Sequence, residues 1–244
     1  MDWLLVIAVF CAFFVKGLVG FANTLVFTSI LSFGTSNLNI SPLELLLNYP
    51  ANFYISWKER AFISWKYCLP ISLLVLLGIL PGVFLLKMGK VEVIKIVFGF
   101  VVVFLGLDMF LQGRRETDTK PNRIFLAIVG LLSGLLCGLF GIGALLSAYI
   151  GRTTDSTKSF KGNLCVVFFI ENTFRIIMYS VTGILTFSTL KLAILLYPVM
   201  FLSLFAGMKA SDLFNEQTVK KTIYVMLILS GLSLVLTNVV TLFR

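Results

Sequence analysis

Histidine is absent from this chain of 244 residues, and charged residues make up only 13% of it. Without histidine the chain lacks the commonest general base, the usual base of a catalytic triad and the commonest zinc ligand. The sequence also has no motif of paired carboxylates. These absences count against most hydrolases and metalloenzymes, so we expect a protein that is not an enzyme and uses no metal or other cofactor.

Cysteine is also scarce, and its placement is uninformative about chemistry. Cys11, Cys68, Cys137 and Cys165 lie in or beside apolar runs and show no CxxC spacing. This pattern indicates buried, unreactive thiols rather than a disulfide framework or a metal site.

The low charge content points to a membrane. Soluble domains carry about 25% charged residues, whereas 59% of this chain is hydrophobic and no hydrophilic stretch is long enough to fold alone. We therefore predict an all-α polytopic membrane protein with one membrane domain, residues 1–244. The net charge of +9 resides in short polar breaks, which is typical of cytoplasmic loops. We expect the lipid bilayer, and no nucleic acid, as a partner.

Eight apolar segments follow one another along the chain. The first lacks a basic start and a cleavage site, so we interpret it as a retained span rather than a signal peptide. The most polar stretch, residues 113–122, is the predicted central loop. The segments are approximately 3–33, 43–57, 67–86, 91–111, 124–151, 164–182, 187–208 and 218–243.

Two of these segments are too long to cross a bilayer once. Residues 3–33 and 124–151 would form helices of about 46 and 42 Å, against a hydrocarbon core of roughly 30 Å. Both contain an internal glycine cluster. We expect each segment to break there, with the broken backbone lining a cavity or covered by protein.

The basic residues test this expectation. If all eight segments simply cross, nine lysines and arginines fall on each side of the membrane. If the two long segments double back, 13 fall on one side and five on the other. The positive-inside rule then predicts basic loops in the cytoplasm and both termini outside.

The two halves of the chain resemble each other. GLVGF at 17–21 matches GLFGI at 138–142, and Asn52 matches Asn172. Internal duplication is typical of transporters. We predict two inverted repeats, 1–112 and 123–244, each an overlong broken or re-entrant first helix followed by three spanning helices. Further matches at an offset of 125 are Gly82 with Gly207, Lys95 with Lys220 and Gly106 with Gly231.

The glycine-rich breaks are the first candidate for a binding site. Their free N–H groups and helix N-termini favour an anion, although small residues also serve close helix packing. The candidate residues here are Gly17, Gly20, Phe21, Asn23, Thr24, Gly138, Gly141 and Gly143.

Polar residues inside apolar segments are the second candidate. Lys16 either faces the site or snorkels to an interface, and Arg175 either binds substrate or pairs only with Glu171 at i,i+4. The asparagines of neighbouring spans would orient oxyanions or coordinate sodium. Arg152 and Lys161 flank a polar loop. They either capture an anion or are ordinary basic residues of a cytoplasmic loop. We assign no role to Asp108 or Glu44, which we expect near span ends. The asparagines are Asn48, Asn52 and Asn172.

Specific motifs extend over nearly the whole chain. The first half has GLVGFANTLVF at 17–27, Trp65-Lys66 at the entry to a span, and Gly78 and Gly82. The second half has GLLCGLFGIGALLSAYIGR at 134–152 and SFKGNLCVVFFIENTFRIIMYSVTG at 159–183. In these features the chain resembles the sulfite exporter TauE/SafE family of membrane transporters. It departs from the family's usual run of glycines and following proline at Ala22-Asn23-Thr24 and Ala144-Leu145-Leu146.

The resemblance implies transport of small sulfur-containing anions of the sulfite, sulfonate or sulfoacetate type, in a prokaryotic plasma membrane. A potential of 100 mV is worth about 2.3 kcal/mol per charge, and drives a monoanion outward by about 50-fold. We therefore expect a secondary transporter that exports its substrate by alternating access. An anion channel and a non-transporting membrane subunit are the alternatives. The sequence does not determine whether transport is coupled to protons or sodium, whether the protein forms a homodimer, or which anion is the exact substrate.

Overall fold

Every regular element in the described part of the chain is helical. The computed structural model describes residues 3–31, 37–88, 123–140, 143–154 and 156–242, together with part of 96–111. The helices are α1 (Trp3–Val19), α2 (Asn23–Leu31), α3 (Asn37–Lys58), the short 3₁₀ helix η1 (Arg60–Phe62), α4 (Trp65–Met88), α6 (Arg123–Phe140), α7 (Ala144–Thr153), α8 (Thr157–Val181), α9 (Phe187–Leu213) and α10 (Glu216–Leu242).

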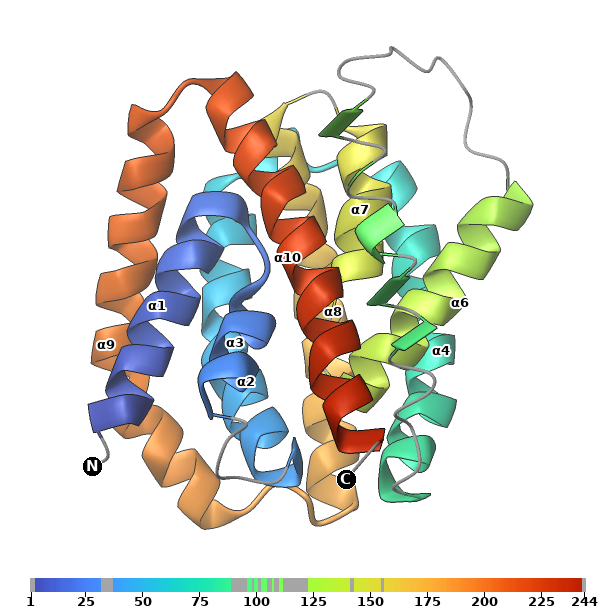
Figure 1. Ribbon diagram of the computed structural model, residues 1–244, viewed down its shortest axis with the longest axis vertical. Helices are drawn as coiled ribbons and strands as arrows, with labels where there is room; N and C mark the ends of the chain where they lie inside the picture. Colours follow the sequence, from blue (N-terminus) through green and yellow to red (C-terminus); the bar gives the residue numbers. More distant parts are fainter. Residues whose placement is uncertain are drawn as a thin grey trace.

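Both overlong segments are interrupted at their glycine clusters, as their lengths predict. Helix α1 ends at Val19 and α2 begins at Asn23, while α6 ends at Phe140 and α7 begins at Ala144. In Figure 1, α1 and α2 run in opposite directions, and so do α6 and α7. The predicted central loop, residues 113–122, lies outside the described residues.

Three helices extend beyond the apolar segments, because polar residues continue them. Helix α3 begins at Asn37 rather than near residue 43, and α9 continues to Leu213 rather than ending near 208. Helix α8 begins at Thr157, seven residues before the predicted start. Its first turn is capped by Ser156, whose side chain accepts a hydrogen bond of 3.1 Å from the backbone of Ser159.

Several helices suit a lipid environment. Three in the described residues are long and apolar enough to span a membrane, at Trp65–Gly82, Thr157–Val181 and Phe187–Leu213, and Trp3–Val19 is apolar but shorter. The 25 residues of α8 would extend about 38 Å, enough to cross a hydrocarbon core of roughly 30 Å. Large apolar side chains such as Leu77 and Leu202 are exposed on the outer faces.

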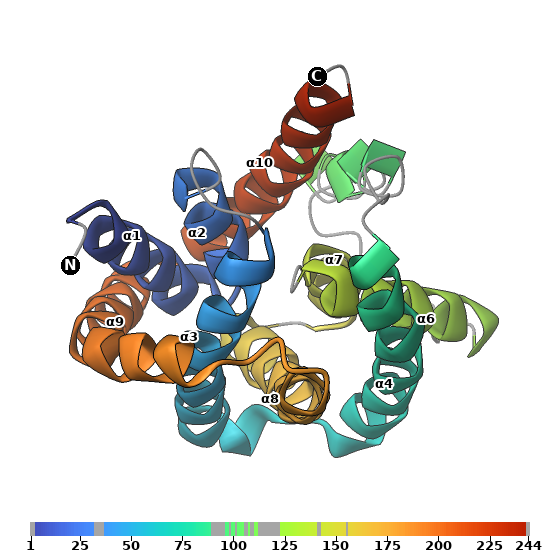
Figure 2. The same cartoon turned by 90° about the horizontal axis from the view of Figure 1, so that it is seen from below.

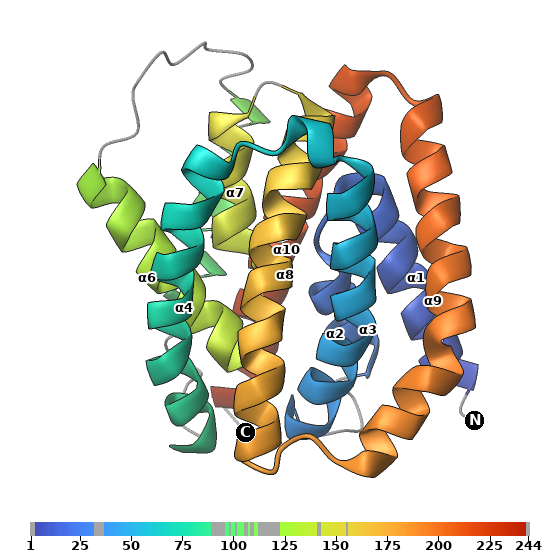
Figure 3. The same cartoon turned by 180° about the vertical axis from the view of Figure 1, so that it is seen from behind.

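The second part of each interrupted segment lies beside the first. Seen along the long axis, α1 and α9 lie side by side at one edge and α4 and α6 at another, with α2 between α1 and α10 and α7 beside α6 (Figure 2). Helices α3 and α8 pack against each other between these pairs. Helix α1 starts and α10 ends at the same end of the molecule (Figures 1 and 3).

Glycines allow the two outer pairs to approach closely. A Cβ atom on Gly207 would meet the backbone of Phe14, and one on Gly17 would meet the backbone of Leu204. At the other pair, a Cβ on Gly138 would lie 2.7 Å from the carbonyl oxygen of Ile79, beside Gly82. Such contacts between small residues are the usual means of packing helices in membranes.

Candidate functional site

The interruption between α1 and α2 depends on an unusual backbone. Gly20 has φ +91° and Ala22 has φ 68°, both in the left-handed region. The N–H of Gly20 closes α1 by donating to the carbonyl of Lys16 at 2.7 Å. A Cβ on Gly20 would lie 3.0 Å from Cγ of Lys161. Glycine is therefore required here both by its φ angle and by the neighbouring lysine.

Helix α2 begins with two side chains that bind a buried carboxylate. Asn23 donates from Nδ2 to Oε1 of Glu44 at 2.7 Å, and Thr24 donates from Oγ1 to the same oxygen at 2.8 Å. Lys16 donates from Nζ to Oδ1 of Asn23 at 3.4 Å. Lys16 has no exposed surface, so it does not snorkel to an interface.

Arg175 connects this cluster to α6 and α8. Its Nη1 lies 3.1 Å from Oε1 of Glu171 and donates to the carbonyl of Cys137 at 3.2 Å. Its Nη2 lies 3.9 Å from Oε2 of Glu44. The guanidinium also stands over the ring of Tyr179, 5.4 Å from its centroid. The predicted pair of Arg175 with Glu171 is confirmed, and it belongs to a larger network.

The network is balanced in charge. It contains two cations, Lys16 and Arg175, and two carboxylates, Glu44 and Glu171, all almost completely buried. An isolated charge in such surroundings is costly, and opposite charges compensate one another. A further anion would therefore need the partial positive charge at a helix N-terminus, which is about half a unit per helix.

Residues of both interruptions line one small cavity. Its volume is about 20 Å³, which is room for roughly one water molecule and less than an oxyanion requires. An oxyanion can bind here only if the residues around the cavity move apart. The lining residues are Phe21, Ala22, Asn23, Thr24 and Leu25 from the first interruption, Gly143 and Ala144 from the second, and Asn48, Phe168 and Glu171.

Three buried asparagines carry polar atoms that find no hydrogen-bond partner within the described residues. These atoms are Oδ1 of Asn48, both side-chain polar atoms of Asn52, and Nδ2 of Asn172. Buried polar groups are usually paired. Asn48 lines the cavity, so its free oxygen is available to a molecule bound there.

A much larger cavity opens at the end of the molecule away from the start of α1. We call it the vestibule; its volume is about 650 Å³, and its lining includes Lys58, Lys158, Lys161 and Ser211. Nζ of Lys161 donates to the carbonyl of Gly17 at 3.0 Å and to Oγ of Ser211 at 2.7 Å. Lys161 thus joins the C-terminal end of α1 to α8 and α9 at the floor of the vestibule.

Comparison with known proteins identifies the family. The family model described as "Sulfite exporter TauE/SafE" matches residues 5–234. The chain belongs to the TauE/SafE family. No curated protein and no solved structure matches it. A TauE/SafE protein is a membrane transporter of sulfite-type anions, consistent with a protein that is not an enzyme.

The structure brings some of the predicted residues of this TauE/SafE protein together. Phe21, Asn23, Thr24, Asn48 and Gly143 line the small cavity. Gly17 and Gly138 instead lie within helices at close crossings. Gly141 and the side chain of Arg152 lie outside the described residues, although the backbone of Arg152 belongs to α7.

Two predictions about individual residues were wrong. Lys161 does not flank a loop, because α8 already begins at Thr157 and the lysine is buried within it. Glu44 was expected near a span end and was assigned no role. It instead lies inside α3 and binds the start of α2. A signal for Glu44 was present in the sequence: it precedes Asn48 and Asn52 at steps of four, which places all three on one helix face.

Proposed function

We propose that this TauE/SafE protein is a secondary transporter that exports small sulfur-containing anions across the plasma membrane by alternating access. The sulfite, sulfonate and sulfoacetate types are the candidate substrates. The main support is the small cavity that residues of both interruptions line, two of whose lining residues, Asn23 and Glu171, bind Lys16 and Arg175. Two helix N-termini, those of α2 and α7, begin at this cavity and favour an anion.

The oxygens of the substrate would bind donors at the start of α2. Asn23 and Thr24 offer a side-chain amide and a hydroxyl there, and Lys16 provides a positive charge next to Asn23. The asparagines of α3 and α8 would complete the pocket. Access would come from the vestibule when the contacts of Lys161 with Gly17 and Ser211 open.

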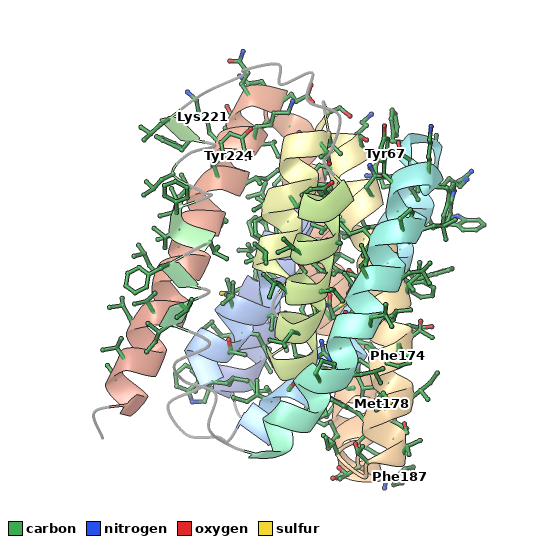
Figure 4. The ribbon with its side chains drawn as sticks, turned by 90° about the vertical axis from the view of Figure 1, so that its right-hand side faces the viewer. Tyr67, Phe174, Met178, Phe187, Lys221 and Tyr224 are labelled. Atoms are coloured by element: carbon green, nitrogen blue, oxygen red, sulfur yellow. The ribbon has the colours of Figure 1, made fainter. Side chains whose placement is uncertain are left out.

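The vestibule end would face the cytoplasm. Figure 4 shows Lys221, Tyr224 and Tyr67 at this end and Phe187 at the other. Exposed aromatic side chains, Trp57 and Trp65 at the vestibule end and Trp3 and Phe187 at the other, would lie at the two membrane interfaces. The lysines that line the vestibule, Lys58, Lys158 and Lys161, would then lie on the side that the positive-inside rule favours.

Equivalent helix contacts support two inverted repeats, 1–112 and 123–244. Helix α1 of the first half packs on α9 of the second, and α6 of the second packs on α4 of the first. Gly17 meets Gly207 in one contact, and Gly138 meets Gly82 in the other. The sequence repeat pairs the same residues, Gly17 with Gly138 and Gly82 with Gly207.

The proposal is tested with purified protein in liposomes loaded with radiolabelled sulfite or sulfoacetate. We expect saturable efflux of at least one anion, accelerated when the potential favours outward movement of negative charge. A bilayer recording with single-channel conductance would indicate an anion channel instead. Absence of saturable flux of every anion, with folded protein, would contradict the proposal and favour a non-transporting subunit.

A further inference from the structure

Glu44 occupies the position where an anionic substrate would bind. Its Oε1 accepts from both Asn23 and Thr24, the first two residues of α2. A carboxylate has the same charge and the same acceptor oxygens as an oxyanion. The protein thus carries its own anion, attached to α3, at the N-terminus that a substrate would use.

A second binding position for the same carboxylate lies next to the first. Nη2 of Arg175 is 3.9 Å from Oε2 of Glu44, beyond hydrogen-bond length. Neither Nη2 nor Nε of Arg175 has a hydrogen-bond partner in the part of the chain that the structure describes. Arg175 is only 1% exposed. A small shift of Glu44 toward Arg175 would free Asn23 and Thr24 and satisfy a buried guanidinium nitrogen.

We propose that Glu44 is a tethered substitute for the substrate, which binds α2 in the empty transporter and moves to Arg175 when an anion enters. Because the N-terminus of α2 is then never left without an anion, the empty protein can return across the membrane without cargo. The transporter would thus perform net export rather than obligatory exchange. This inference rests on the proposed function and specifies how the same site works.

The test compares two fluxes of whichever anion, sulfite or sulfoacetate, the wild type transports better. Net efflux into anion-free buffer requires return of the empty transporter, whereas exchange against the same unlabelled anion does not. In the wild type the two rates should be similar. In Glu44→Gln, net efflux should fall about tenfold or more relative to exchange, because hydrogen bonds to a charged group are stronger than those to a neutral one.

Glu171→Gln is the matched control, because it also removes one buried carboxylate beside Arg175. Glu171 pairs with Arg175 on its own helix, at 3.1 Å, whereas Glu44 binds the first two residues of α2. We expect this variant to change both fluxes to the same extent. If it alters their ratio as strongly as Glu44→Gln does, overall charge and not the position of Glu44 is responsible, and the inference is overturned.

If size-exclusion chromatography shows that Glu44→Gln does not fold, Glu44→Asp is measured in its place. It keeps the charge but is shorter by one carbon, so net efflux should fall relative to exchange by less than in Glu44→Gln. An unchanged ratio in every Glu44 variant that folds would overturn the inference while leaving transport itself established. Absence of flux in the wild type would contradict the proposed function.

Discussion

At the scale of single residues, the interior depends on polar side chains that compensate one another. Lys16, Glu44, Glu171 and Arg175 are buried, and each has at least one of the others, or Asn23, within 4 Å. Removing one member leaves its partner charged and buried, which typically costs several kcal/mol. Conservative variants that keep hydrogen-bonding capacity, such as Glu to Gln, are therefore the informative ones.

Lys161 offers a prediction about access to this interior. Lys161→Met would remove the bonds to Gly17 and Ser211 at the floor of the vestibule. Cys165, one turn further along α8, has no exposed surface, and its thiol lies 3.7 Å from the carbonyl oxygen of Gly20. In a protein whose other cysteines are replaced by alanine, we expect Lys161→Met to speed maleimide labelling of Cys165 about tenfold or more, because the variant loses two hydrogen bonds from a charged group.

Lys58→Met is the control for that experiment. Lys58 also lines the vestibule, but its ion pair with Asp212, at 3.4 Å, is largely exposed. Exposed pairs contribute little, so labelling should stay at the wild-type rate. Equal labelling in both variants and the wild type would show that Lys161 does not close the path.

Some of these residues were predictable and others were not. The i,i+4 spacing predicted the pair of Arg175 with Glu171, whereas the sequence left open whether Lys16 faces the site or snorkels to an interface. The bond of Glu44 to Asn23 joins residues 21 apart in sequence, and that of Lys161 to Gly17 joins residues 144 apart. Neither follows from periodicity, because both depend on how separate helices pack.

At the scale of elements, the interruption after α1 is a strained turn, and this gives a second prediction. Gly20→Ala places a side chain at φ +91° and against Lys161. A non-glycine residue in this region costs roughly 1–2 kcal/mol. With the added contact we expect a loss of about 2–3 kcal/mol, or several degrees in melting temperature in detergent.

Gly183→Ala separates the two causes. Gly183 also has a positive φ, +70°, but a Cβ there would meet no atom within 4 Å. Only the backbone cost should remain, so its melting temperature should fall by less than that of Gly20→Ala. Equal losses would show that the contact with Lys161 does not matter.

The interruptions themselves were predictable from length, since about 30 Å of hydrocarbon cannot hold a straight helix of 31 residues. The start of α8 could not be predicted from the sequence, because residues 157–161 are as polar as a loop. What makes these residues helical is the cap at Ser156 and the packing of Gly162 against Glu59. Packing of this kind overrides the local composition.

At the scale of the whole molecule, the proposed orientation can be tested directly. Helix α10 ends at the side opposite the vestibule, so we predict an external C-terminus. Alkaline phosphatase, which is active only outside the cytoplasm, should be active when fused after Arg244. Fused after Lys209, close to the vestibule, it should be inactive. The reverse pattern would contradict the orientation and the direction of export derived from it.

The count of basic residues predicted this orientation from the sequence alone, because short charged loops remain on the side where they are made. The family was also predictable, because its motifs occur in both halves of the chain. The two glycine-rich breaks were expected to form one binding site, and Asn23 and Gly143, which lie 120 positions apart, do line one cavity in the folded protein.

The central claim is that both interruptions form one substrate site in an alternating-access transporter. Counterflow tests it most directly: liposomes preloaded with the unlabelled anion that the wild type transports best are diluted into a trace of the same labelled anion. We predict a transient accumulation of label above equilibrium, which Thr24→Val and Ala144→Leu abolish and which Leu195→Ala, at an exposed position of α9, retains. Label that only equilibrates, or an accumulation that survives both Thr24→Val and Ala144→Leu, would contradict the account.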